Sequence, residues 1–204
     1  MTTDCTFCTV SAPNLVDQLE GAGISWKAYM EGLPSPCYQG PSSGEYAKKH
    51  DPFLYFDDVA GSAARCSHVV PLTQLGADLA GSALPMFAWI TPDLCHDTHD
   101  CVVATGDGFL AGLIPRLQRA MGPDGVLFLT WDEGSTDAGC CGSPGGGHVA
   151  TIVVGSAVAP GARLAGPFSH YSILRTIEAM WGLPPLRQAG CSCTEVMTAF
   201  FAAA

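Results

Sequence analysis

Residues 86–101 hold a continuous apolar run, MFAWIT (residues 86–91), followed at once by the polar tract PDLCHDTHDC (residues 92–101). The apolar run predicts a strand that is buried on both faces, as strands in parallel sheets are, and Pro92 ends it. Two similar runs follow along the chain, VLFLTW (residues 126–131) and ATIVV (residues 150–154). Polar clusters follow two of these three strands directly. Since α/β sheets bind ligands at the carboxyl ends of their strands, we expect the functional residues there.

Helical patterns alternate with these strands. Apolar residues at helical spacing predict helices over residues 13–23, 72–79, 107–121 and 170–183, with a further short strand over residues 24–29. Pro115 lies inside the third of these helices and is expected to bend it or end it early. The alternation indicates an α/β fold, a three-layer α/β/α domain with a mainly parallel sheet. Residues 32–68 are rich in Pro, Gly and Ser and form a long loop excursion within a single domain over residues 1–204.

Composition narrows the classes of function. Of 204 residues, 48% are hydrophobic and 14% are charged, so the chain can bury a sizeable core and is not intrinsically disordered. A net charge of −10 argues against nucleic acid or an anionic membrane surface as the main partner, because both are bound through clustered Lys and Arg. The sequence contains no apolar run near the roughly 20 residues that span a bilayer, so we expect no integral membrane segment.

Ten cysteines in close sets predict a disulfide framework and therefore an oxidising compartment, secreted or in the cell envelope. The spacing favours the pairs Cys5–Cys8, Cys37–Cys66 and Cys95–Cys101, and Cys140 and Cys141 are expected to reach Cys191 and Cys193. Zinc is the alternative, because Cys5-x-x-Cys8 resembles half of a zinc knuckle, but no second half follows. Residues 1–5 (MTTDC) lack the basic and apolar segments of a secretory signal, so we expect the export signal upstream of this chain.

The polar tract after the first strand concentrates ligating side chains in a chain that has few charges. They are Asp93, His96, Asp97, His99 and Asp100. Imidazole and carboxylate groups bind zinc, manganese or iron and also suit general acid catalysis. The alternative is a hydrophilic loop whose Asp side chains cap turns. We favour the functional interpretation because the tract lies at a strand end.

A second cluster follows the strand at residues 126–131. Asp132 and Glu133 are adjacent carboxylates, which repel each other unless a cation or hydrogen-bond donors compensate, and a divalent metal ion is the usual solution. The alternative is an Asx-type turn with a solvated Glu. His148 follows a Gly-rich loop and is either a metal ligand or phosphate contact, or a histidine satisfied by hydrogen bonds. His170 begins the last helix, whose N-terminus favours anions, or it belongs only to the helix cap. His50, in KKHDPF, is the weakest candidate.

These clusters, in this order, resemble the secreted bacterial phosphoesterase family, which includes acid phosphatases and phospholipase C-type enzymes and belongs to the alkaline phosphatase superfamily. The resemblance is carried by NLVDQLEGAGISWKAYMEGLP, YAKKHDPFLYFDD, TPDLCHDTHDC, GDGFL, LFLTWDEG, GGGHVATIVVGSAVAPG and FSHYSILRTIEAMWGL. It covers most of residues 14–183. The most specific part is the strand followed by TWDEG, the Gly-rich loop and His148. By contrast, the sequence has no G-x-S-x-G nucleophile elbow, P-loop or H-E-x-x-H motif.

The resemblance implies roles for individual residues. Asp132 and Glu133 match the paired metal ligands of the superfamily, and Asp97 and Asp100, which flank His99, are weaker metal candidates. The catalytic histidines would be His99, His148 and His170, with a divalent metal ion of unknown identity as cofactor. The implied partner is a phosphorylated small molecule or a phospholipid head group.

The resemblance also implies a departure from the family. Members begin with a strand, an E-N-H-S-like segment and a helix that carries a Ser or Thr nucleophile, and nothing in this chain matches them. The chain therefore resembles a member that is truncated at its N-terminus. The function expected for the complete protein is metal-dependent hydrolysis of phosphoric esters through a phosphorylated intermediate. The alternatives are a non-catalytic, disulfide-stabilised secreted binding module and an inactive fragment.

Overall fold

The computed structural model describes residues 4–134, 136, 146–164 and 168–201, and the chain divides into two compact units, residues 1–120 and residues 121–204. Each unit is described by itself. In the described part, no helix is both long and apolar enough to cross a membrane.

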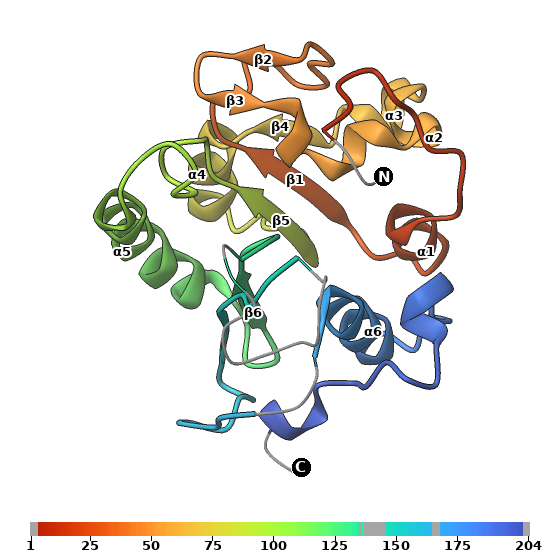
Figure 1. The fold of residues 1–204 in the computed structure, drawn as a ribbon, viewed down its shortest axis with the longest axis vertical. Coiled ribbons are helices and arrows are strands. Elements are labelled where there is room, and N and C mark those ends of the chain that lie inside the picture. Colours follow the sequence, from red (N-terminus) through yellow and green to blue (C-terminus); the bar gives the residue numbers. More distant parts are fainter. Residues whose placement is uncertain (1–3, 135, 137–145, 165–167, 202–204) are drawn as a thin grey trace. The chain divides into compact units, whose positions relative to one another are not determined.

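A three-stranded parallel sheet forms the centre of the first unit, in the order β4 (Val69–Pro71), β1 (Trp26–Met30), β5 (Phe87–Thr91) (Figure 1). Ala28 pairs with Val69 on one side and with Trp89 on the other, so all three strands run in the same direction. The central strand is the most buried, with Ala28 and Tyr29 fully inaccessible. An α/β fold built on a mainly parallel sheet is therefore confirmed.

The helices of this unit form where the sequence supplies caps and apolar faces. The helix α1 (Leu15–Gly21) begins with a capping box in which Asn14 and Asp17 bond each other's backbone N–H groups, and it buries Val16 and Leu19. The helix α4 (Thr73–Ala80) packs against β1 and β4, and α5 (Val103–Ala120) packs against α4.

Pro115 does not end α5, which continues to Ala120, and the helix begins four residues before the expected start at residue 107. Pro115 is exposed, as is Ala111, whose carbonyl would have accepted the missing N–H bond. Water can satisfy that carbonyl, while Leu113 and Leu117 hold the buried face of the helix in place.

The excursion over residues 32–68 is an ordered set of short elements. It contains β2 (Ser42–Ser43), β3 (Tyr46–Ala47), the 3₁₀ turns η1 (Lys48–His50) and η2 (Pro52–Tyr55), and the short helices α2 (Asp57–Ala60) and α3 (Ala63–Cys66). The predicted Cys37–Cys66 disulfide closes it, with a Cα–Cα distance of 5.0 Å. Phe53 anchors its middle, because its ring stacks on Trp26 at 5.4 Å and meets Trp89 edge-on at 5.7 Å.

The second unit contains the strands β6 (Val126–Thr130) and β7 (Thr151–Gly155), the helix α6 (His170–Met180), and the turns η3 (Arg187–Gly190) and η4 (Thr198–Phe200). β6 and β7 pair antiparallel, with Phe128 opposite Val153, so this pair differs from the parallel arrangement of the first unit. A parallel connection needs a long crossover, usually a helix, and the described residues between these strands form none. The buried carboxylate of Glu178 in α6 has a hydrogen-bond partner, because its Oε1 accepts the Leu186 N–H at 2.8 Å.

The disulfide predictions are confirmed for Cys5–Cys8, Cys37–Cys66 and Cys95–Cys101. The expected link of Cys140 and Cys141 to Cys191 and Cys193 is wrong for Cys191 and Cys193. Cys191 and Cys193 bond each other, because their Cα atoms lie 5.1 Å apart and within the range that a disulfide spans. Cys140 and Cys141 lie outside the described residues.

Asp51 is a fully buried carboxyl group between η1 and η2, and it gives the first unit a pH-dependent stability. Burial raises its pKa to about 7, against the lesser, opposing influence of the Tyr46 hydroxyl, which donates to its Oδ2 at 3.3 Å. Its Oδ1 has no hydrogen-bond partner in the structure as described. Because the folded state holds the proton more tightly than the unfolded state, Asp51 favours folding below about pH 4, and this contribution is lost as the pH rises to about 7.

We expect Asp51→Asn to remove that dependence. The free energy of unfolding of the variant, relative to the parent, should rise by up to about 1.4 kcal/mol per pH unit between about pH 4 and 7 and then level off. Urea titrations across this range measure it, with the exposed Asp124→Asn as a matched control. A constant difference between Asp51→Asn and the parent at all pH values would contradict the assignment.

Candidate functional site

The carboxyl edge of the parallel sheet gathers the polar side chains of the first unit. Because Met30 pairs with Thr91 across β1 and β5, the residues that follow both strands leave the sheet side by side. The Glu31 N–H donates to the Thr91 carbonyl at 2.9 Å and extends the ladder by one bond. Glu31 thereby lies at the start of the polar tract of residues 92–101.

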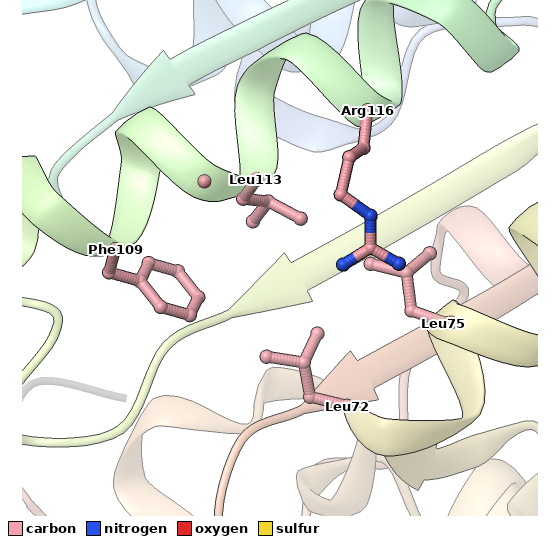
Figure 2. A pocket seen from close by; sticks show the side chains of 7 residues that line it. Leu72, Leu75, Phe109, Leu113 and Arg116 are labelled. Carbon is pink, nitrogen blue, oxygen red and sulfur yellow. The ribbon is translucent and has the colours of Figure 1, made fainter.

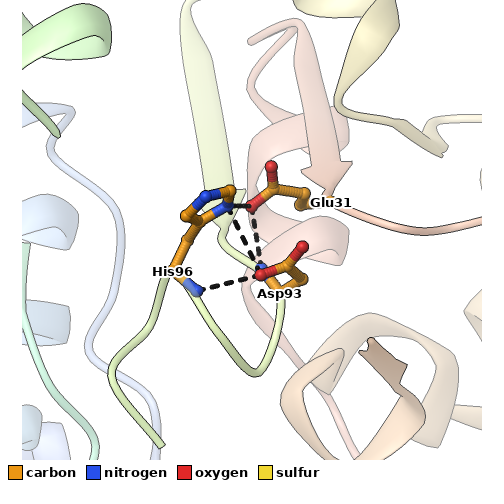
Figure 3. Close-up of side chains that lie close together, drawn as sticks. All are labelled: Glu31, Asp93 and His96. Atoms are coloured by element: carbon orange, nitrogen blue, oxygen red, sulfur yellow. Dashed lines mark hydrogen bonds and ion pairs between the residues drawn. The ribbon is translucent and has the colours of Figure 1, made fainter. Parts of the chain in front are cut away.

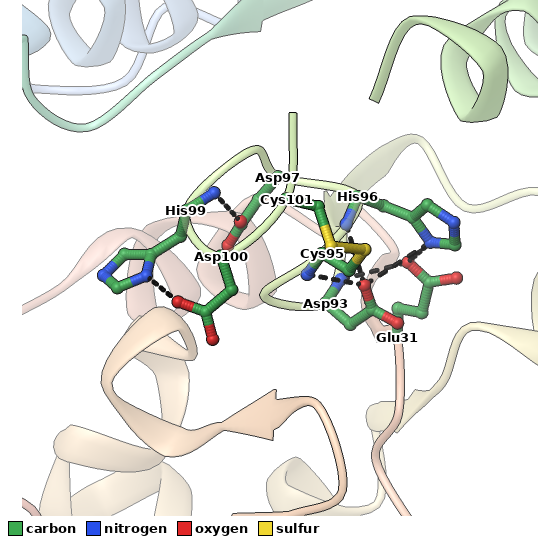
Figure 4. Close-up of a disulfide and its surroundings, with 8 residues drawn as sticks. All are labelled: Glu31, Asp93, Cys95, His96, Asp97, His99, Asp100 and Cys101. Atoms are coloured by element: carbon green, nitrogen blue, oxygen red, sulfur yellow. Dashed lines mark hydrogen bonds and ion pairs between the residues drawn. A yellow bond between two sulfur atoms is a disulfide. The ribbon is translucent and has the colours of Figure 1, made fainter. Parts of the chain in front are cut away.

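The tract is a compact loop closed by the Cys95–Cys101 disulfide, whose Cα atoms are 4.7 Å apart (Figure 4). Asp93 shapes its first turn, since its Oδ1 accepts the N–H groups of Cys95 and His96 at 3.1 and 2.9 Å. The loop packs against α5 at Gly106, where a Cβ would lie 2.7 Å from the His96 carbonyl oxygen. The turn-capping interpretation thus holds for Asp93. The other polar side chains of the tract lie on a loop that the disulfide closes.

Glu31, Asp93 and His96 form one cluster on this loop (Figure 3). The His96 Nδ1 lies 2.9 Å from Glu31 Oε2 and 3.4 Å from Asp93 Oδ1, and the Asp93 N–H donates to Glu31 Oε2 at 3.0 Å. His96 also stacks on Phe109 of α5, with ring centroids 4.6 Å apart. In the described part of the chain, this is the one group of three such side chains whose ligand atoms all lie within 4.8 Å of one another. Two carboxylates and an imidazole suit zinc, manganese or iron.

A second cluster surrounds His99 and brings in His50 from η1. The His50 Nδ1 lies 3.0 Å from Asp97 Oδ2, and the His99 Nδ1 lies 2.7 Å from Asp100 Oδ1. The two imidazole rings are 5.8 Å apart, and the Lys49 ammonium lies 3.4 Å from His99 Nε2. Figure 4 shows His99 and Asp100 on one side of the disulfide, with His96 and Glu31 on the other. We call Lys49, His50 and His99, with their partners Asp97 and Asp100, the histidine cluster.

The histidine cluster combines groups that can bind an anion with carboxylates. Lys49, which also pairs with Asp4 at 3.2 Å, supplies one fixed positive charge, and the two histidines supply groups that can donate hydrogen bonds, while Asp97 and Asp100 contact the rings at Nδ1. An imidazole held at Nδ1 by a carboxylate keeps Nε2 for a ligand, and it can carry a proton to or from that ligand. The side chains of His99 and Asp100 are about half exposed, so solutes can reach them.

The second unit holds the remaining predicted residues. His170 opens α6, and its Nε2 donates to the Asp132 backbone carbonyl at 2.7 Å, which fixes the proton on Nε2 in the neutral ring. The side chains of Asp132 and Glu133 are exposed directly after β6. Near them, Gly134 and Gly147 approach so closely that a Cβ on either would overlap the backbone, which explains two of the glycines beside His148.

The sequence-based assignments for the site therefore have different outcomes. The structure brings His99 together with Asp97 and Asp100, and it brings His170 to the backbone of Asp132. The roles of His148, Asp132 and Glu133 as catalytic and metal-binding groups stay predictions. Sequence reasoning undervalued His50, and it missed Glu31. A signal for Glu31 was present, since it lies two residues after the strand predicted over residues 24–29 and so near the edge where ligands bind.

Known proteins resemble this chain over most of its length. A family model described as the phosphoesterase family matches residues 2–184. The chain is 31% identical over 189 residues to an acid phosphatase of Aspergillus niger, and 32% identical over 191 residues to a phosphate-repressible acid phosphatase of Penicillium chrysogenum. It is also 31% identical over 173 residues to a phosphatidylinositol-3-phosphatase of Mycobacterium tuberculosis.

These alignments cover most of the chain and a smaller share of each relative. They include 87% of this chain for the two fungal proteins and 84% for the mycobacterial protein. They include 43%, 44% and 54% of the relatives, respectively, so the chain spans about half or less of the length of these proteins.

The Cys95–Cys101 disulfide should hold the loop at the sheet edge in one conformation. Replacing both cysteines by serine is expected to lower the free energy of unfolding by about 2 kcal/mol, the chain-entropy value for so small a ring. Amide hydrogen exchange should accelerate at Asp97 and Asp100, whose N–H groups bond the Asp93 and Leu94 carbonyls inside the loop.

The matched control is the double serine variant of Cys191 and Cys193, which removes another short-range disulfide, in the second unit. It should leave the exchange rates at Asp97 and Asp100 unchanged. Equal exchange rates in the parent and in the Cys95 and Cys101 variant would show that the disulfide does not order the loop.

Proposed function

Because this chain belongs to the phosphoesterase family, we propose that the protein hydrolyses phosphoric monoesters and that the histidine cluster binds the phosphoryl group. The reaction cleaves the P–O bond of the ester, takes up one water molecule, and releases an alcohol and inorganic phosphate. The names of the relatives, acid phosphatases and a phosphatidylinositol-3-phosphatase, favour a monoester as substrate. A phosphorylated small molecule and a phosphorylated lipid head group both belong to this class.

The observation that carries the proposal is the pairing of two histidines with two carboxylates beside a lysine at the carboxyl edge of the sheet. Lys49 and the Nε2 atoms of His50 and His99 would bind the phosphoryl oxygens. Such donors stabilise the negative charge that develops on those oxygens in the transition state. Asp97 and Asp100 hold the rings in place, in addition to the weaker metal-binding role that the sequence suggests for them.

His99 is also suited to protonate the leaving oxygen. A doubly protonated ring would donate Nδ1–H to Asp100 and Nε2–H to the leaving oxygen, in place of the Lys49 ammonium that lies 3.4 Å from Nε2. When the ester bond breaks, the alcohol oxygen takes this proton, and the neutral ring regains one from water. For His148 and His170, the proposal is contact with the phosphoryl group or transfer of a proton, as the resemblance implies.

A divalent metal ion fits the donor chemistry of this chain in two places. Asp132 and Glu133 are exposed, adjacent carboxylates, and in the described part of the second unit neither side chain forms an ion pair. Glu31, Asp93 and His96 supply two carboxylates and an imidazole within ligand reach of one another. We propose Asp132 and Glu133 as the ligands of the catalytic ion, following the family resemblance. A bound ion would polarise the phosphoryl oxygens and lower the pKa of the attacking nucleophile.

An extracellular or envelope location belongs to the same proposal. Four disulfides join the eight cysteines in the described residues, and disulfides persist mainly in oxidising compartments. The net charge of −10 and the acidic pI of about 4.7 argue against nucleic acid as the main partner.

Hydrolysis of p-nitrophenyl phosphate, with and without added divalent metal ions after chelation, tests the proposal. We expect metal-dependent turnover by the complete protein. His99→Asn should lower kcat/KM by about 100-fold or more, the usual contribution of a general acid. Asp132→Asn should reduce turnover and raise the metal concentration needed for half of the maximal rate.

Glu195→Gln is the matched control for Asp132→Asn, because it neutralises another exposed carboxylate of the second unit. It should leave both turnover and the metal requirement unchanged. Hydrolysis that is unaffected by His99→Asn would refute the role of the histidine cluster. A protein that binds phosphate but hydrolyses no monoester under any metal condition would be a binding module instead.

A further inference from the structure

A cavity of about 270 Å³ lies between α4 and α5, away from the histidine cluster (Figure 2). Its walls are apolar over most of their surface, with Leu72 and Leu75 on the α4 side and Phe109 and Leu113 on the α5 side. Leu75 and Leu113 form its buried floor, at 3% and 8% exposure. Its volume is close to the lower end of the roughly 300–1,000 Å³ range of small-molecule pockets.

Glycines create this space. Gly76 on α4 and Gly112 on α5 both line the cavity, and neither carries a side chain to fill it. A Cβ on Gly112 would meet nothing within 4 Å, and a Cβ on Gly76 would lie 3.7 Å from the Arg116 guanidinium. The two helices therefore face each other across a gap that their own side chains leave open.

Arg116 is the one charged group among the residues that line the cavity. Its side chain leaves α5 and its guanidinium ends beside Leu75 (Figure 2). Across the described residues, it forms no ion pair or hydrogen bond, in a chain whose net charge is −10. A guanidinium at one end of an apolar cavity is complementary to an anionic group attached to an apolar body.

We propose that this cavity binds a single-chain amphiphilic anion of the fatty-acid type, with the carboxylate at Arg116 and the aliphatic chain along α5 toward Phe109. The distance along the helix from Phe109 to Arg116 is seven residues, or about 10 Å, which suits a medium-length chain. Phe109 also stacks on His96, with ring centroids 4.6 Å apart, so the ligand would end next to the loop of residues 92–101. This proposal does not depend on phosphoester hydrolysis.

Octanoate is the probe, and titration of the ¹⁵N-labelled protein followed by NMR measures both the affinity and the location. The amide signals of Gly76 and Gly112 and the side-chain Nε signal of Arg116 should shift together. Octanoate should bind about tenfold or more tightly than octanol or octyltrimethylammonium, because only octanoate forms a charge-assisted hydrogen bond with the guanidinium.

Two matched pairs of variants separate the cavity from its surroundings. Gly112→Leu fills the cavity and should weaken octanoate binding at least about tenfold, a loss typical of apolar contacts that are sterically blocked. Gly108→Leu, one turn earlier on the same helix, should not, because Gly108 does not line the cavity. Leucine favours helix over glycine, so both variants are expected to fold. Arg116→Gln should abolish the preference for octanoate over octanol, whereas Arg119→Gln should keep it.

Three results would overturn the proposal. The first is the absence of octanoate binding to the parent protein, as would occur if another part of the protein covered the cavity. The second is equal weakening by Gly112→Leu and Gly108→Leu. The third is equal affinity for octanoate and octyltrimethylammonium. Hydrolysis of p-nitrophenyl phosphate should be unchanged in all four variants, so a failure here is distinguishable from a failure of the proposed enzymatic activity.

Discussion

The parallel pairing of β1 with β4 on one side and with β5 on the other determines where the polar side chains of the first unit lie. Parallel strands end at the same edge, and the register of Met30 with Thr91 brings the residues after β1 and β5 together. Glu31 and the loop of residues 92–101 meet there for this reason alone. If that register slipped by one residue, every side chain of β1 would change faces, and the cluster of Glu31 with His96 would be lost.

The disulfides and the aromatic contacts complete this edge. The excursion over residues 32–68 is joined at its ends by Cys37–Cys66 and held in its middle by Phe53 between Trp26 and Trp89. Phe53 follows His50 closely, so its anchoring helps to set where that histidine lies. In the polar loop, Cys95–Cys101 closes the chain around Asp97 and His99. Two segments that are distant in sequence thus present their histidines to each other, 5.8 Å apart between ring centroids.

Most of the regular elements could be predicted from the sequence, because continuous apolar runs and 3.6-residue periodicity are local signals. β5, β6 and α6 lie within the predicted ranges or nearly so. β4 was missed because a strand of three residues leaves almost no pattern. The antiparallel direction of β7 was not predicted, since strand pairing depends on the path between strands and not on the strand itself. The sequence left open whether Pro115 bends or ends its helix, because that depends on whether the freed carbonyl faces water.

The candidate site was only partly predictable for a similar reason. The position of the polar loop after β5 followed from the rule for strand ends, and three of the predicted residues, Asp97, His99 and Asp100, do lie together. The ion pair of His50 with Asp97 joins residues far apart in the chain, and no local pattern encodes it. Glu31 carried no prediction, because its place beside the polar loop depends on the register of β1 with β5.

The proposed function depends on binding of the phosphoryl group at the histidine cluster. The most direct measurement is ¹⁵N NMR of the histidine rings during titration with inorganic phosphate. His68 is the internal reference. It packs against Trp26 and directly precedes β4, so it lies at the end of that strand away from the carboxyl edge of the sheet. We predict saturable shifts of the ring nitrogens of His50 and His99, with those of His68 unchanged. If the rings of His50 and His99 do not respond to saturating phosphate, or respond no more than His68, the claim is contradicted.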